Sequence, residues 1–383
     1  MQVREGYKQT EVGVIPEDWQ IRTLGEVGDV KMCKRIFKNQ TQVTGDIPFY
    51  KIGTFGSSPD AFISEALFNE YKSKFSFPKK GDVLISAAGT IGRTVIYDGS
   101  PAYFQDSNII WIDNDQTKVS NDYIWHFYKI IKWSVSHGGI VARLYNANIK
   151  SIQVYFPNHS EQSAIATALS DVNELLSAQD KLIAKKRDIK QAAMQQLLTG
   201  KQRLPGFTGE WEVKLLGDVV EIRKGQLITE KDAVAGSVPV IAGGKKPAYY
   251  HNKSNRTGKT ITVSASGASA GYVAFFHTAI FASDCSTINE GQTYSIEFIF
   301  FQLQLKQVVI YKAQTGGAQP HIHAVDLMPI EIGCPSLPEQ NAIATVLSDM
   351  DADLAALEQQ RDKTRDIKQG MMQELLTGRI RLV

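Results

Sequence analysis

One stretch of this chain is written twice, and the duplication limits the possible folds more than any other feature. Residues 161–204 match residues 339–382 at 25 of 44 positions, without a gap, at a shift of 178. Both copies contain the blocks EQ-AIAT-LSD, RDIKQ and LLTG-RL. A repeat of this quality indicates that the chain is built from two related halves, so each half has to be interpreted against the other.

Each copy of the repeat predicts one long helix. Apolar residues recur at alternating steps of three and four, as at Ile165, Leu169 and Leu176. This heptad spacing is typical of a helix that buries a narrow stripe against another helix. Gly200 and Gly378 follow the two helices and predict left-handed caps. About 38 helical residues, at about 1.5 Å each, make a rod roughly 57 Å long, which exceeds what a compact domain needs.

Polar residues interrupt the apolar stripe near the shared RDIKQ block. In a helix pair, polar seam positions lower stability and fix register and orientation. Two interpretations stay open, namely a solvated face after a phase slip and a surface for a partner. The residues concerned are Gln179, Lys186, Lys190, Arg361, Thr364 and Lys368.

Composition narrows the class of protein. A chain of 383 residues with 43% apolar content can bury more than one core, so two or three domains are expected. The formal charge is +2, so any DNA binding has to come from local patches. Cys33, Cys285 and Cys334 have no C-x-x-C spacing, which argues against a zinc site or disulfide framework. No signal peptide or membrane span is recognisable, so we expect a reducing, cytoplasmic setting.

The repeat also covers the segments outside the helices. The motif W-x-x-x-x-L-G begins at Trp19 and again at Trp211, at a shift of 192. The shift is 191 at Pro48 and Pro239, and 178 from Ser86 and Ser264 onward. The first half therefore has 191 − 178 = 13 extra residues, which we expect in a surface loop within residues 55–80.

These observations predict four segments. They are a globular domain at 1–157, a helix at 158–200, a second globular domain at 201–335 and a second helix at 336–383. Short runs of β-branched and aromatic residues, such as Asp82–Ser86 and Thr260–Ser264, predict strands in both domains. Segments 121–132 and 296–311 look helical. The fold class is therefore α+β.

Two motifs imitate enzyme signatures but lack the required context. Residues 267–271 fit the nucleophile elbow G-x-S-x-G, but the sequence after Ser269 predicts a strand instead of a helix, and Ile91 stands at the matching position of the first half. Gly258-Lys-Thr imitates a phosphate loop without its first glycine. The pair His321-x-His323 has no third metal ligand nearby. We therefore predict neither catalysis nor metal binding in this chain.

Basic residues interleaved with aromatic and amide side chains remain, and they recur at corresponding places in both halves. Lysine and arginine bind phosphates, whereas arginine, asparagine and glutamine read base edges. Each cluster alone is compatible with a solvated surface, but their recurrence favours DNA binding. The predicted DNA-binding residues are Lys34, Arg35, Lys38, Lys72, Lys74, Arg93, Arg143, Tyr145 and Asn146 in the first half, and Arg223, Lys224, Lys245, Lys246, Tyr249, Lys253, Arg256, Gln319 and His321 in the second.

With these features the chain resembles the specificity subunits of type I restriction-modification systems. The resemblance rests on the PEDW and GEW openings, the segments LISAAGTIG and TVSASGASAG, the glycine pairs at 138–139 and 316–317, and above all the two repeated helices. It covers essentially the whole chain. It implies two mixed α/β target-recognition domains, joined by two long helices that pack as an antiparallel coiled coil with approximate two-fold symmetry.

The resemblance also implies a function. Two unlike domains would read the two halves of an asymmetric bipartite DNA target, and the helix pair would set the gap between them. Two modification subunits would dock on the helices, and motor-nuclease subunits would join through the complex. S-adenosylmethionine, ATP and Mg²⁺ would bind to those partners and not to this chain.

Three alternatives stay open at the level of the sequence. The chain could serve a methylation-only or fused restriction system. It could be a coiled-coil scaffold whose end domains bind proteins or sugars. It could also be an esterase that uses Ser269.

Overall fold

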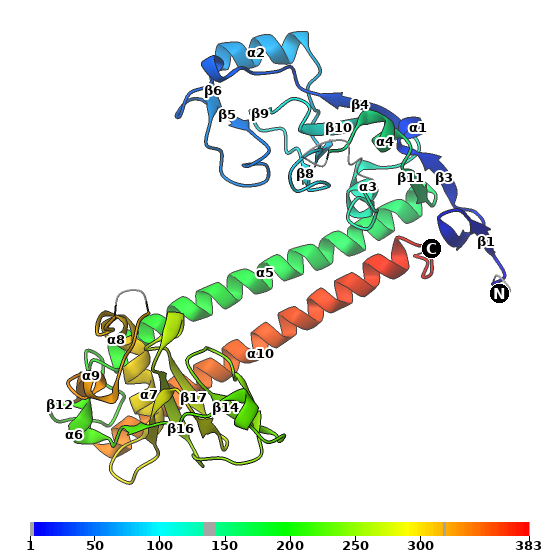
Figure 1. Cartoon of the computed structure of the whole chain (residues 1–383). Helices are drawn as coiled ribbons and strands as arrows, with labels where there is room; N and C mark the ends of the chain where they lie inside the picture. Colours follow the sequence, from blue (N-terminus) through cyan, green and yellow to red (C-terminus); the bar gives the residue numbers. More distant parts are fainter. Residues whose placement is uncertain (1–3, 134–142, 317–318, 383) are drawn as a thin grey trace. The chain divides into compact units, whose positions relative to one another are not determined.

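Figure 1 shows the fold of the 383-residue chain as a computed structural model, which describes residues 4–133, 143–316 and 319–382. Gly138, Gly139 and Gly317 of the predicted glycine turns lie outside these ranges. The chain forms two compact units: unit 1 comprises Met1–Ala178 and Arg361–Val383, and unit 2 comprises Gln179–Gln360.

Each unit contains one globular head and a part of each long helix. These helices are α5 (His159–Leu197) and α10 (Leu337–Leu375), of 39 residues each. The unit boundaries fall inside the helices, so the division into four segments stays a prediction.

The head of unit 1 is built on an antiparallel four-stranded sheet with the order β4-β10-β7-β8. Along β10, Ile110 and Ile112 pack on the cluster that includes helix α3, whereas Ile109 and Trp111 pack on a second, smaller sheet. Successive side chains of a strand point to opposite faces, so β10 is buried on both sides. The strands are β4 (Gly28–Met32), β7 (Val83–Ser86), β8 (Thr94–Ile96) and β10 (Ile109–Asn114).

The smaller sheet has the order β6-β5-β9, with β5 (Ile47–Tyr50) parallel to β9 (Tyr103–Phe104). Helix α2 (Glu65–Lys74) follows β6 (Phe62–Ile63). The sequence predicts that the extra residues of the first half form a surface loop, and this prediction is wrong where α2 stands. Ser64 caps it by accepting a hydrogen bond from the Leu67 amide, and Phe68 is buried under it.

The head of unit 2 repeats this topology. Its sheets have the orders β13-β19-β16-β17 and β15-β14-β18, with β14 parallel to β18. The internal repeat therefore extends to the order of the strands. They are β13 (Arg223–Lys224), β14 (Val238–Ile241), β15 (Tyr249–His251), β16 (Thr260–Ser264), β17 (Val273–Phe276), β18 (Phe281–Ala282) and β19 (Cys285–Asn289).

The predicted strands and helices of the heads are confirmed within a few residues. The run Thr260–Ser264 is β16 as predicted, and the segment 121–132 contains α3. The segment 296–311 is helical as predicted and contains the two helices α7 and α8. The remaining helices are α1 (Leu24–Val27), α3 (Asn121–Phe127), α4 (Asn146–Lys150), α6 (Leu216–Val219), α7 (Ile296–Leu305), α8 (Gln307–Lys312) and α9 (Ala324–Leu327).

Short two-stranded ribbons lie beside the main sheets. In unit 1, β3 pairs with β11 and β1 pairs with β2, whereas in unit 2 β12 pairs with β20. Their bounds are β1 (Tyr7–Thr10), β2 (Gly13–Pro16), β3 (Gln20–Thr23), β11 (Gln153–Phe156), β12 (Glu212–Leu215) and β20 (Glu331–Cys334).

The predicted glycine caps close both long helices. Gly200 and Gly378 have φ values of 70° and 69°, which side chains with a Cβ rarely adopt. A Cβ on Gly378 would also lie 3.1 Å from the ring of Trp19, and one on Gly200 would lie 3.3 Å from the ring of Trp211. Each repeated tryptophan therefore packs against a repeated helix cap.

An arginine–glutamate contact, which we call the clasp, occurs once in each unit. In unit 1, Arg381 follows α10 and bonds Glu161 of α5 at 2.6 and 2.7 Å. In unit 2, Arg203 follows α5 and bonds Glu339 of α10 at 2.5 and 2.6 Å. Both glutamates are buried. Each clasp therefore ties the end of one helix to the start of the other.

The parts of α5 and α10 that lie in unit 2 also pair through ions. Lys190 contacts Asp351 at 2.5 Å and Arg187 contacts Glu358 at 2.5 Å. The higher number on α5 pairs with the lower number on α10, so the helices run antiparallel here. In unit 1, Ile165 and Leu169 of α5 share a buried cluster with Leu375 of α10.

Within the described ranges, no helix combines the length and apolarity needed to cross a membrane.

Candidate nucleic-acid interface

The loop after the parallel strand β9 gathers polar side chains in unit 1. The chain leaves β9 at Phe104 and enters β10 at Ile109. Because β9 pairs with β5 whereas β10 pairs with β7, residues 105–108 make a sharp turn between the two sheets. Ser107 has φ 55°, an uncommon conformation for a residue with a Cβ. We call this loop, with the side chains that contact it, the unit 1 corner.

Two predicted arginines, far apart in the sequence, meet at the unit 1 corner. Arg35 Nε donates to Asp106 Oδ2 at 2.8 Å, and Arg143 Nη2 donates to the Ser107 carbonyl at 2.6 Å. Arg143 also faces Ala88 in a β-bridge. The segment that returns after the glycine pair is therefore held against the corner.

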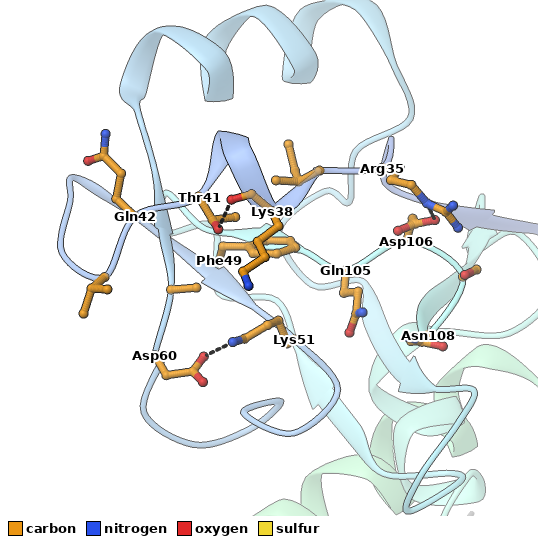
Figure 2. A pocket seen from close by; sticks show the side chains of 14 residues that line it. Arg35, Lys38, Thr41, Gln42, Phe49, Lys51, Asp60, Gln105, Asp106 and Asn108 are labelled. Atoms are coloured by element: carbon orange, nitrogen blue, oxygen red, sulfur yellow. Dashed lines mark hydrogen bonds and ion pairs between the residues drawn. The ribbon is translucent and has the colours of Figure 1, made fainter. Parts of the chain in front are cut away.

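A pocket of ≈ 610 Å³ opens beside Arg35. Figure 2 shows Lys38, Lys51 and Gln105 around it, with Lys51 bonded to Asp60. Gln105 Oε1 accepts from the Ile52 amide at 2.8 Å, which leaves the amide N–H groups of Gln105 to donate elsewhere. The pocket thus combines cations that suit phosphates with amides that suit base edges.

The other predicted residues of unit 1 lie in three further places. Lys34 stacks on Phe75 at 5.1 Å, Lys72 lies 5.3 Å from the rings of Phe68 and Phe77, and Lys74 pairs with Glu70 at 3.0 Å. These lysines form one group around α2.

Arg93 stands apart from that group and donates to the Phe55 carbonyl at 2.7 Å. Tyr145 and Asn146 are exposed at the start of α4. No recorded contact in the described part of the chain joins these three residues to the unit 1 corner.

Unit 2 has a corner at the matching position with different side chains. Asp284 matches Asp106 at the shift of 178, but it accepts a short hydrogen bond from the Ser266 hydroxyl. His321 matches Arg143 and faces Ser266 in a β-bridge, as Arg143 faces Ala88. A Cβ on Gly243 would lie 2.6 Å from the Ser266 carbonyl, so only glycine fits beside this corner. The two heads therefore present different chemistry on one scaffold.

The N–H groups of the Arg256 side chain donate hydrogen bonds to residues of its own unit. Its guanidinium bonds Thr287 Oγ1 at 2.9 Å, the Asn255 carbonyl at 2.8 Å and the Lys224 carbonyl at 3.0 Å. This geometry favours a role in holding β13 to β19. Arg223 pairs with Glu221 at 2.6 Å, and this hydrogen bond raises the pKa of Arg223. Arg223 and Lys224, the two residues of β13, are both exposed.

The remaining predicted residues of unit 2 are on its surface loops. Lys245 lies 5.4 Å from the Tyr272 ring, and Lys246 and Lys253 are exposed. Tyr249 donates its hydroxyl hydrogen to the Ile228 carbonyl at 2.5 Å. Gln319 is exposed, two residues before the unit 2 corner at His321.

Sequence reasoning missed the polar residues that complete the corners. Gln105, Asn108 and Asp106 were not predicted as site residues, nor was Gln42 of the unit 1 pocket. A signal existed, since the polar run Gln105–Asn108 separates two buried strands and Asp106 recurs as Asp284.

The rejected enzyme motif has the predicted local structure. Ser269 ends a short 3₁₀ turn, and the strand β17 follows where a nucleophile elbow requires a helix. Among the described residues, no group of three or more His, Cys, Asp or Glu side chains is arranged to hold a metal.

Comparison with known proteins adds relatives for both halves. A protein of Haemophilus influenzae, named as a type I restriction enzyme specificity subunit, is 58% identical over 164 residues, which are 43% of this chain and 43% of that protein. The chain therefore matches less than half the length of that relative. The MjaX specificity subunit of Methanocaldococcus jannaschii is 24% identical over 99% of this chain and 97% of its own length.

Solved structures share the fold. The type I restriction-modification S subunit of M. genitalium superposes with a TM-score of 0.67 at 16% identity and covers 98% of both chains. A chain from a type I R-M system superposes with a TM-score of 0.58 at 14% identity, over 96% of this chain and 99% of its own. The family model for the type I restriction modification DNA specificity domain matches residues 16–185 and 208–364. Because the model matches each half of the chain, and most of its length in all, this chain belongs to the family of type I restriction modification DNA specificity domains.

Proposed function

We propose that this chain reads an asymmetric, bipartite DNA target for a type I restriction-modification complex and positions the modification subunits on it. One observation carries the proposal: two heads of identical strand order place different side chains at matching corners. Arg35 and Arg143 stand in unit 1 where unit 2 has Gly225, by strand register, and His321. A shared scaffold with unlike polar tips suits two unlike half-sites.

The corners and their surroundings are the proposed DNA contacts. In unit 1 these are the pocket with Lys38 and Gln105, the lysines around α2, and Arg143. Lysines would bind phosphates and set the register, whereas Gln105 and the arginines would read base edges. Arg256 would support the fold of unit 2 instead of touching DNA, because its donors are already used.

The long helices are the proposed docking place for two modification subunits. Large apolar side chains stay exposed on them, namely Leu175 and Ile367 in unit 1 and Leu182 and Ile189 in unit 2, at 42–61% exposure. Contiguous exposed apolar surface on a helix marks a site of protein–protein interaction. We further propose that α5 and α10 form an antiparallel coiled coil along their length, which sets the gap between the half-sites.

Chemistry would come from the partners. The modification subunits would bring S-adenosylmethionine and methylate an adenine that is flipped out of the duplex. Motor-nuclease subunits would bring ATP and Mg²⁺. This chain would bind no cofactor and catalyse no step, and it would work in the cytoplasm with the chromosome.

The test is to co-express the chain with its cognate modification subunit and map methylated adenines across a genome. We expect one motif with two unlike halves separated by unread bases. Replacing residues 1–157 with the matching segment of a relative should change one half only. A contiguous palindromic motif, or a motif that changes in both halves, would contradict the proposal.

A further inference from the structure

Two lysines of unit 1 lie close together without a counter-charge. Lys129, just after α3, places its Nζ 3.2 Å from the centre of the Trp125 ring. Lys368 comes from α10. Burial, and then the charge of Lys368, lower the pKa of Lys129 to about 8. Burial, followed by the charge of Arg365, lowers the pKa of Lys368. No carboxylate of the described residues forms an ion pair with either lysine.

Buried polar atoms without a hydrogen-bond partner lie on α3 and on the part of α5 that it contacts. Trp125 Nε1, His126 Nδ1 and Asn173 Nδ2 have no hydrogen-bond partner among the described residues. His126 is itself fully buried, and its other ring nitrogen meets Ser170 Oγ on α5 at 3.2 Å. Unpaired buried polar groups cost free energy, so several in one place with two cations indicate a missing acceptor. We call Trp125, His126, Lys129, Asn173 and Lys368 the unit 1 cation cluster.

Unit 2 supplies that acceptor from its own chain. At the shift of 178, Lys368 matches Lys190 and Asn173 matches Asp351. Lys190 bonds Asp351 at 2.5 Å. Lys129 matches Gln307, whose amide donates to the Gly271 carbonyl at 2.7 Å and accepts from the Val273 amide at 3.3 Å. The same place in the repeat is therefore neutral and satisfied in unit 2.

We propose that the unit 1 cation cluster receives an aspartate or glutamate side chain of a protein partner, which would neutralise Lys368 as Asp351 neutralises Lys190 in unit 2. The inference rests on the proposed docking of modification subunits and specifies the chemistry of that contact. A carboxylate is favoured over a DNA phosphate because the matching site of the same fold already holds a carboxylate against Lys190. The two docking events would therefore differ, since only in unit 1 would a carboxylate of the partner form an ion pair with the cluster.

Two variants test the cluster by making it resemble unit 2. Asn173→Asp installs the missing carboxylate beside Lys368, and Lys129→Gln removes one cation. Native mass spectrometry and titration of the full chain with the cognate modification subunit would count and rank the two binding events. We expect each variant to weaken one event about tenfold or more and leave the other unchanged, because it removes or neutralises one side of a charge pair with the partner. Added salt should weaken that same event in the wild type.

A matched control is Lys363→Gln, which removes an exposed lysine from the same part of α10 and should leave both events unchanged. If the wild-type chain binds the modification subunit and both cluster variants bind it equally well, this inference is wrong and the proposed function stands. If the variants lose DNA affinity but keep both modification subunits, the cluster holds a phosphate and the inference is again wrong. If the wild-type chain binds no modification subunit, the proposed docking fails first.

Discussion

The two units use the same clasp at the ends of their long helices, yet they place unlike side chains at their corners. Arg381 with Glu161 and Arg203 with Glu339 are the same pair at a shift of 178. At the corners, by contrast, the repeated aspartate bonds an arginine in unit 1 and a serine in unit 2. The contacts that hold the fold together are thus copied, whereas the corner side chains, which are the proposed DNA contacts, differ. This is the pattern expected of one scaffold that carries two specificities.

Breaking a clasp should give the largest effect. Arg381→Ala leaves Glu161, only 1% exposed, without its cation, and an unpaired buried charge costs about 3 kcal/mol of unfolding free energy. Arg203→Ala should likewise lower the free energy of unfolding of unit 2, because Glu339 is as buried as Glu161. Urea unfolding of the full chain would measure both. Arg379→Ala, which removes an exposed pair with Glu374, is the control and should cost less than about 1 kcal/mol. Equal losses in all three variants would mean that the clasp is an ordinary surface pair.

The cation cluster predicts that unit 1 is more sensitive to acid than unit 2. Burial, helped by the charges of Lys129 and Lys368, lowers the pKa of His126 to about 4, and a backbone hydrogen bond with Ala166 of α5 opposes this shift only in part. As the pH falls, His126 is therefore protonated in the unfolded chain before it is protonated in the folded chain. The contribution of neutral His126 to the free energy of unfolding is fully present above pH 6.5. It is lost as the pH falls toward 4, by about 3 kcal/mol in all.

His126→Gln copies Gln304 of unit 2 and should remove this part of the acid sensitivity. Unfolding curves of wild type and variant between pH 4 and 7 would be compared, so that carboxylates common to both cancel. Parallel curves across this range would show that His126 does not titrate as described.

Exchanging corner residues should change specificity with little effect on stability. Arg143→His gives unit 1 the residue of unit 2, and His321→Arg is the reciprocal change. Loss of an arginine that reads a base costs about 1–3 kcal/mol of discrimination at that position. Methylation mapping should show relaxed preference in one half of the motif for each variant, and in opposite halves for the two. A uniform loss of methylation without relaxed preference would assign these residues to phosphate contacts.

The sequence contained enough information for the scaffold, because its signals are local. The β-branched run at Thr260–Ser264 and the glycines after the long helices each predict their own structure, and the shift of 178 relates the two halves. Helix α2 also has a local signal, the capping Ser64 before Glu65, but the 13 extra residues of the first half favour a surface loop at the same place.

The corners could not be predicted in the same way. They depend on three long-range pairings, of β5 with β9, of β4 with β10 and of Arg143 with Ala88, which bring Arg35, Asp106 and Arg143 together across more than 100 residues. Clustering of basic residues also cannot distinguish an arginine whose donors are free from one such as Arg256, whose donors are used by its own fold. Residue type was therefore a weaker guide to the site than to the strands.

The smallest effect is expected at Ser269, where unit 2 has a hydroxyl group and unit 1 has an isoleucine side chain. Ile91 stands at this position in unit 1, and Ser269 lies in a turn before a strand, without the helix that a nucleophile elbow needs. Ser269→Ala should therefore leave the methylation motif, the binding of modification subunits and the unfolding curve unchanged within about 0.5 kcal/mol. Hydrolysis of an activated ester by the wild type and its loss in the variant would show instead that unit 2 has a chemistry that unit 1 lacks. The two heads would then differ in catalysis as well as in the side chains of their corners.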